Sequence, residues 1–117
     1  MSTPDQVIDT LADQAVPDDL SRLDRPFAAK LARLEQDGRL AADTLEKLRL
    51  MWQMLRAPDS EVPWKTKALI MAAVSYLVSP VDVIPDPIGK VGYVDDAQVV
   101  QLVWKRIEAT ATAFRRG

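Results

Sequence analysis

Histidine and cysteine are both absent from this 117-residue chain, and their absence excludes several kinds of chemistry. Without cysteine there can be no disulfide, no thiolate nucleophile and no zinc–thiolate site. Without histidine the chain lacks the side chain that most often serves as a general base and as a transition-metal ligand. Chemistry at a site in this protein would therefore rest on carboxylates, lysines or hydroxyls.

A concentration of positive charge is missing as well. The 15 basic and 17 acidic residues are interspersed and give a formal net charge of −2. Phosphate backbones are bound by concentrated basic surfaces, so we do not expect nucleic acid as a ligand. With 48% hydrophobic and 27% charged residues, the composition is that of a globular chain, and residues 1–117 suffice for a single domain with a buried core.

Long hydrophobic runs are also scarce. The longest is ALIMAAVSYLV, Ala68 to Val78, and it is interrupted by Ser75. Crossing a bilayer takes roughly 20 apolar residues, so this run predicts a buried core helix. The N-terminal MSTPDQVIDTLADQ is acidic and does not resemble a signal peptide. We expect a cytoplasmic protein, with a peripheral position at the membrane as the alternative.

What the sequence does contain is helical periodicity, without the alternation that indicates strands. Apolar spacing and helix-end signals predict five helical segments: about 3–17, 18–37, 41–57, 63–78 and 95 onward. The second ends at Gly38 and should be broken or bent at Pro26. The fourth is apolar almost all round and should be central. The predicted fold is an all-α compact bundle of four or five helices around an antiparallel pair formed by the last two.

The stretch YLVSPVDVIPDPIGKVGYVDD, residues 76–96, separates these two helices and has its own composition. Its prolines and glycines exclude a continuous helix, while its apolar residues should hold it against the core. It therefore predicts an ordered Asp/Pro-rich corner between the helices. The residues expected to shape this corner are Tyr76, Ser79, Pro80, Ile84, Pro85 and Gly92.

Four aspartates in this stretch admit two interpretations. They are Asp82, Asp86, Asp95 and Asp96. In one, they cap helix ends and accept hydrogen bonds from backbone amides. In the other, they converge on Mg²⁺ or Ca²⁺, since hard cations prefer oxygen ligands, and such a site could support hydrolysis. The spacing is not that of an EF-hand, and no residue is assigned a catalytic role.

The same stretch resembles a known family. The segments SPVDVIPD and GYVDD are similar to the YkvA-like family (DUF1232), a bacterial domain of unknown function. The matching positions are Tyr76, Ser79, Pro80, Asp82, Ile84, Pro85, Asp86, Gly92, Asp95 and Asp96. The resemblance covers about residues 64–107, whereas residues 1–60 resemble nothing recognised. The chain departs from the pattern at Pro87, Gly89 and Lys90.

The resemblance implies a compact accessory domain, because some relatives are embedded in larger, membrane-associated proteins. We therefore predict a non-enzymatic accessory or protein-interaction domain with a protein partner and no cofactor. The alternatives are the Mg²⁺ or Ca²⁺ site and a peripheral membrane protein that presents its apolar hairpin to lipid or to a membrane partner. The basic last helix, with Lys105, Arg106 and the terminal FRRG, could also touch an anionic surface.

The large apolar side chains favour core packing over ligand binding. Trp52 and Trp104 stand at helical apolar positions and Trp64 at a helix start. Met51 and Met54 could form a partner-binding groove, but their spacing favours core filling.

Overall fold

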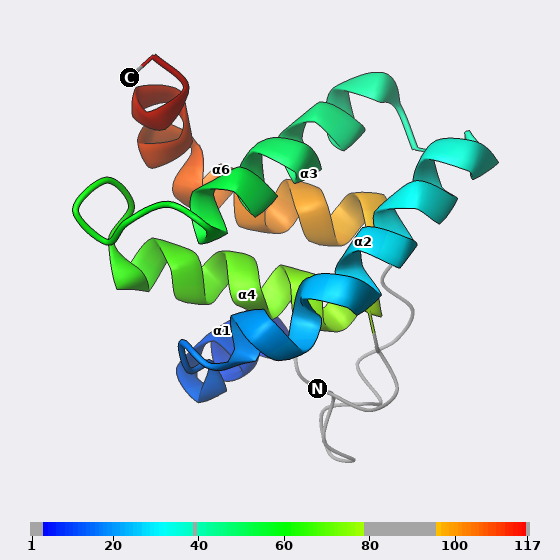
Figure 1. The fold of residues 1–117 in the computed structure, drawn as a ribbon. Helices are drawn as coiled ribbons and strands as arrows, with labels where there is room; N and C mark the ends of the chain where they lie inside the picture. The colour runs from blue at the N-terminus through cyan, green and yellow to red at the C-terminus, as the bar shows by residue number, and fades with distance from the viewer. Residues whose placement is uncertain (1–3, 39, 79–95, 117) are drawn as a thin grey trace.

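The computed structural model describes residues 4–38, 40–78 and 96–116, and these residues form five helices (Figure 1). In chain order the helices are α1 (Pro4–Gln14), α2 (Asp19–Asp37), α3 (Ala42–Leu55), α4 (Trp64–Val78) and α6 (Asp96–Arg116). Every regular element in this part of the chain is a helix, which confirms the predicted all-α bundle.

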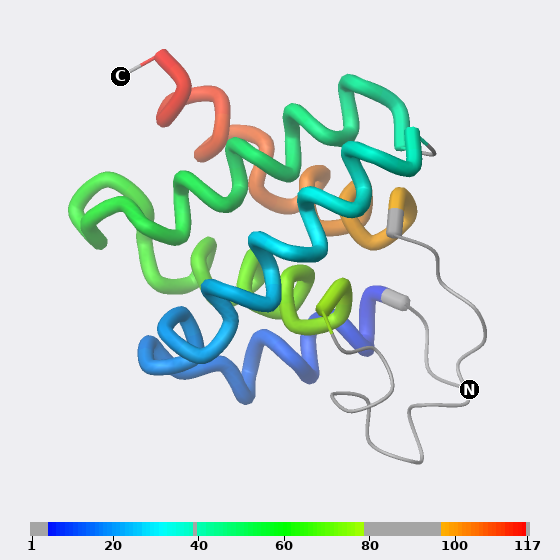
Figure 2. The backbone as a smooth tube through the Cα atoms, turned by 45° about the vertical axis from the view of Figure 1, so that its right-hand side comes forward, coloured from blue at the N-terminus to red at the C-terminus, as the bar shows by residue number. Residues whose placement is uncertain are grey.

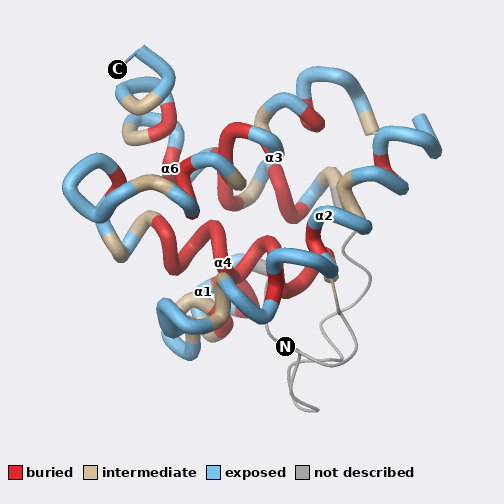
Figure 3. Tube along the Cα trace, in the orientation of Figure 1, coloured by how far each residue is buried: buried red, intermediate tan, exposed pale blue. Residues whose placement is uncertain are grey.

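Helix α4 lies at the centre and contacts each of the other four described helices. Eleven of its fifteen residues are buried, in one unbroken run from Lys67 to Leu77. Because α4 is apolar on nearly every side, it has no face suited to water and must be covered all round. Figure 3 shows this buried helix surrounded by helices whose outer faces are exposed.

Helices α4 and α6 run in opposite directions, as both backbone views show (Figures 1 and 2). The start of α4 and the C-terminal turns of α6 therefore share one end of the bundle. The end of α4 at Val78 and the start of α6 at Asp96 lie at the other. This arrangement confirms the predicted antiparallel pair. The predicted corner between them, residues 79–95, lies outside the described residues.

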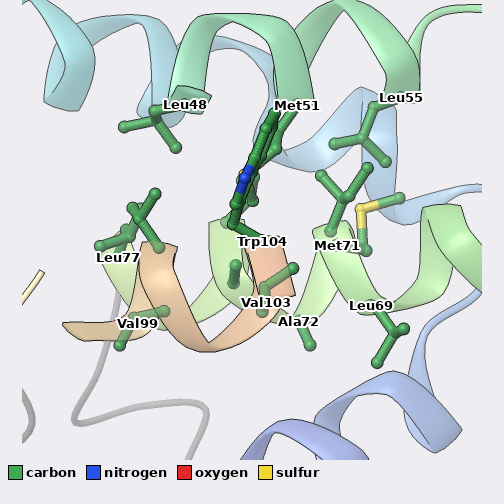
Figure 4. Close-up of a cluster of buried hydrophobic side chains, with 14 of the residues drawn as sticks. Leu48, Met51, Leu55, Leu69, Met71, Ala72, Leu77, Val99, Val103 and Trp104 are labelled. Atoms are coloured by element: carbon green, nitrogen blue, oxygen red, sulfur yellow. The ribbon is translucent and has the colours of Figure 1, made fainter. Parts of the chain in front are cut away.

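The tryptophans and methionines of α3 and α6 fill the core, as the sequence predicts. Figure 4 shows Trp104 of α6 directed toward α3, where Met51 lies. Trp104 is buried, and Met51 and Met54 are completely so. Trp52 is half-buried, and its ring centroid lies 4.5 Å from that of Phe27. These side chains pack between the helices and stabilise the contacts of one helix with another.

Helix α2 continues through Pro26, where the sequence predicts a break or bend. Its buried residues, Leu23, Phe27 and Leu34, lie on one face on both sides of the proline. Packing of that face offsets the hydrogen bond that a helix-interior proline cannot donate. The predicted stop at Gly38 is confirmed, since this glycine ends α2 with a left-handed φ of 66°.

Candidate functional site

The candidate site lies at the end of the bundle where the α3–α4 connection, residues 56–63, meets the last two turns of α6 (Figure 1). We call this region the clasp end, because Lys67 of α4 holds the connection there through two hydrogen bonds described below. The connection here is short and carries the sequence RAPDSEVP. Two prolines restrict its backbone, so little conformational freedom remains to be lost when it is ordered.

Backbone hydrogen bonds and one buried side chain fix the path of the connection. The amides of Glu61 and Val62 both donate to the Pro58 carbonyl, at 2.9 and 3.1 Å. The side chain of Val62 is completely buried and anchors the second half of the connection in the core. Residues 58–62 therefore form a closed turn whose position is set by α3 and α4.

Lys67 holds the same connection from beneath. It lies in the first turn of α4, and only 9% of its side chain is exposed. Its ammonium nitrogen Nζ donates to Asp59 Oδ1 at 2.6 Å and to the carbonyl oxygen of Ala57. A buried ammonium without such acceptors would be strongly destabilising, so these two contacts make its burial tolerable. Lys67 therefore stabilises the connection, and we call its two hydrogen bonds the Lys67 clasp.

A pocket of about 380 Å³ opens beside this clasp. It is lined by Glu61 from the connection and by Thr110, Ala113 and Phe114 from α6. Phe114 is half-buried and packs against the core, while Glu61 is exposed. The pocket thus combines a carboxylate, a hydroxyl and an aromatic ring on a base that the Lys67 clasp keeps in place. Such a combination suits the binding of a ligand or of a partner's side chain.

Elsewhere, polar contacts link helices to one another. Between α3 and α6, Lys47 Nζ donates to Gln101 Oε1 and Gln101 Nε2 donates to Thr44 Oγ1, both at 3.4 Å. The Lys47 ammonium also lies 5.5 Å from the ring centroid of Trp104. Among the described residues, no buried side-chain nitrogen or oxygen lacks a hydrogen-bond partner. Lys47, Gln101 and Thr44 therefore have structural roles, in holding α3 and α6 together.

The residues that the sequence singles out lie mostly outside the described part of the chain. Tyr76 is buried in the last turns of α4. Ser79, Pro80, Ile84, Pro85 and Gly92 lie outside the described residues, as do Asp82, Asp86, Asp95 and the side chain of Asp96. Residues 4–38, 40–78 and 96–116 bring together no group of three or more acidic side chains that could hold a metal. The cation site stays a prediction, which selective broadening of amide resonances by Mn²⁺ would test.

The clasp and the pocket are the features that sequence reasoning missed. A signal for Lys67 was present, since it precedes Ile70, Met71 and Val74 by three, four and seven residues and so shares their buried face. No comparable signal exists for the pocket, because Glu61 and Phe114 are far apart in the chain and meet only through the packing of α6 on α4.

Comparison with known proteins adds the family. Residues 66–102 match the family described as "Protein of unknown function (DUF1232)". The chain is 36% identical over 78 residues to "Uncharacterized membrane protein YkvA" of Bacillus subtilis strain 168, over 62% of this chain and 72% of that protein. No solved structure gives a significant match.

The family match includes Lys67 and most of α4 but ends before the pocket residues of α6. No helix in the described ranges is both long enough and apolar enough to cross a membrane. The extent of the match to YkvA, together with the matching residues 66–102, decides the assignment: the chain belongs to the YkvA-like family of proteins of unknown function, DUF1232.

Proposed function

We propose that this chain is a non-enzymatic interaction domain that binds a partner protein at the clasp end. The observation that carries the proposal is the pocket between Glu61 and Phe114, built on a connection that Lys67 fixes from beneath. An ordered binding surface loses little conformational entropy when a partner docks, which favours affinity. The remaining polar contacts of the described helices have the structural roles given above.

The clasp end also has the anatomy of a small docking site. Phe114 offers a partly exposed aromatic ring supported by the core, and aromatic side chains in such positions contribute much of the binding energy at interfaces. Ala113 leaves room beside the ring, and Glu61 and Thr110 supply polar groups at the rim.

Site-specific photocrosslinking in the native cells tests this proposal. A photoreactive amino acid at Ala113 should give a discrete protein adduct, because this position lines the pocket. The matched control is Ala32, an exposed alanine on α2 far from the pocket in sequence and in fold. Adducts of equal yield at both positions, or no adduct at Ala113, would contradict the proposal.

A second candidate function is peripheral association with a membrane, and the printed name of the Bacillus subtilis relative as a membrane protein favours it. In this chain, Lys105, Arg115 and Arg116 are exposed on α6, while Arg106 is paired with Asp9 of α1 at 2.6 Å. Exposed cations near one helix end attract anionic lipid headgroups, and salt screens this attraction.

Co-sedimentation with vesicles containing anionic lipid tests the membrane candidate. Binding should occur at low ionic strength, fall as salt is added, and weaken when Arg115 and Arg116 are both changed to Gln. Vesicles of neutral lipid are the control. Equal recovery with neutral and anionic vesicles, or none with either, would rule out this electrostatic association.

A further inference from the structure

The α3–α4 connection carries two acidic side chains with different surroundings. Asp59 is paired with the buried ammonium of Lys67 at 2.6 Å. Glu61 lies two residues further along and lines the pocket, and within the described residues no ion pair engages its carboxylate. The negative charge of Asp59 is thus neutralised by Lys67, whereas the negative charge of Glu61 faces the pocket.

The wall opposite Glu61 consists of one face of α6. Thr110, Ala113 and Phe114 are spaced by three and four residues, and such positions lie on the same side of a helix. Arg115 follows Phe114 at about 100° and so falls on another face, and Arg116, although three residues after Ala113, is not among the lining residues. Arg106 shares the pocket face one turn earlier, but its guanidinium is paired with Asp9. Glu61 is accordingly the charged residue of the lining.

Two further features of this wall favour a positive charge. The pocket lies beside the last turns of α6, where unpaired backbone carbonyls give the helix end a partial negative charge that Arg115 and Arg116 in the same turn offset in part. The face of an aromatic ring such as Phe114 also attracts cations through its quadrupole. Within the pocket lining, the Glu61 carboxylate and the Phe114 ring both favour a cation.

We propose that this pocket receives the side chain of a lysine or arginine from the partner protein. The inference rests on the proposed function and specifies the chemistry of the partner. The cationic group would pair with the Glu61 carboxylate and donate to the Thr110 hydroxyl oxygen, while its methylene stem lies along Ala113 and Phe114. A volume of about 380 Å³ accommodates one long side chain.

Other occupants fit these groups less well. An anionic group in the pocket would meet the carboxylate of Glu61, which repels it. A purely apolar side chain would cover Glu61 without pairing it, and covering an unpaired charge is unfavourable. Charge complementarity therefore selects a basic side chain.

Titration of the intact chain with short peptides, followed by amide NMR, tests the inference. The probes are end-capped three-residue peptides with a central arginine or lysine, compared with the uncharged analogues citrulline and norleucine. We expect the cationic peptides to shift the resonances of Glu61, Thr110, Ala113 and Phe114, with affinities about fivefold higher than those of the uncharged analogues. This preference should shrink as salt rises.

Variants of similar shape separate charge from folding. Glu61→Gln should lower the affinity for the arginine peptide about fivefold and abolish the preference over citrulline. Glu108→Gln is the matched control, since Glu108 is an exposed glutamate on another face of α6, and it should leave the affinity unchanged. Phe114→Leu, which keeps an apolar side chain in place, should weaken both cationic peptides.

Three results would overturn the inference. They are equal shifts with charged and uncharged peptides, an absence of shifts at the pocket, and tighter binding of the free diamine putrescine than of either peptide. None of them depends on the crosslinking experiment. An adduct at Ala113 together with no preference for cations would uphold the docking site and reject the basic side chain as its occupant.

Discussion

At the scale of single residues, the placement of Lys67 links the sequence most directly to the candidate site. The residues that follow it in α4 are buried, so its stem packs in the core, and the side chain reaches out to the α3–α4 connection. The ammonium then has one acceptor in the backbone and one in the exposed carboxylate of Asp59, whose side chain is 74% exposed. Water can replace Lys67 at the exposed Asp59 carboxylate more easily than at the backbone carbonyl of Ala57.

This difference predicts unequal effects of substitution. Lys67→Met should lower the free energy of unfolding by about 1–2 kcal/mol, because it removes both hydrogen bonds while keeping a long apolar side chain. Asp59→Asn should cost less than about 1 kcal/mol, because the pair is open to water on the Asp59 side. Urea unfolding of both variants measures the difference.

Lys65→Met serves as the control, since Lys65 is exposed in the same turn of α4. Its effect should stay within about 0.5 kcal/mol. If Lys67→Met were as harmless as this control, Lys67 would not act as a clasp.

Residue patterns in the sequence correctly placed the large apolar side chains. Met51, Met54 and Trp104 were expected in the core from their helical spacing, and all three are buried. The same spacing marks Lys67 as facing inward, but no local pattern names its acceptors. Asp59 is eight residues away, and only the turn at residues 58–62 brings it within reach.

At the scale of helices, the end of α2 was the most predictable feature. Gly38 adopts a φ of 66°, which side chains with a Cβ disfavour, and a Cβ at this position would meet nothing within 4 Å. The backbone conformation alone therefore decides the cost of substitution.

Gly38→Ala should accordingly lower the free energy of unfolding by about 1 kcal/mol. Gly38→Asn should cost less, since asparagine tolerates the left-handed conformation better than alanine does. Chemical denaturation of the two variants measures both values. Equal costs would mean that the left-handed conformation is not what Gly38 provides.

At Pro26, tertiary packing outweighs the low helix propensity of proline. A proline in a helix interior removes a hydrogen bond and predicts a break, yet α2 runs through it because Leu23, Phe27 and Leu34 are buried on one face. The interior proline therefore leaves α2 less stable than a non-proline residue would.

Pro26→Ala should raise the free energy of unfolding by about 1–2 kcal/mol. The helix gains a backbone hydrogen bond, and this gain is partly offset because the unfolded chain has more conformational entropy without the proline. Because Pro26 is exposed, the change disturbs no core contact. Thermal unfolding followed by circular dichroism provides the measurement, and an unchanged or lower midpoint would contradict this reading of α2.

At the scale of the whole molecule, α4 determines how the parts hold together. It contacts α1, α2, α3 and α6, so helices from the first sixty residues and the last helix pack on the same element. Burying α4 requires both sets, since neither covers it alone.

This dependence predicts one cooperative unfolding transition for the chain. Tryptophan fluorescence reports on α3, α4 and α6 through Trp52, Trp64 and Trp104, and far-ultraviolet circular dichroism reports on all the helices. The two probes should give coincident urea curves. Separate transitions would instead show that residues 1–60 and 64–107 unfold as different units.

The sequence by itself determined the helices, the central position of α4, the antiparallel partner and the family. These follow from apolar spacing, helix-end residues and matching motif positions, all of which are local properties of the chain. The clasp and the pocket were decided only by tertiary structure. Lys67 acquires its acceptors when the turn at residues 58–62 closes over the start of α4. Glu61 acquires its facing wall when α6 packs on α4, because contacts between residues distant in sequence depend on how whole helices meet.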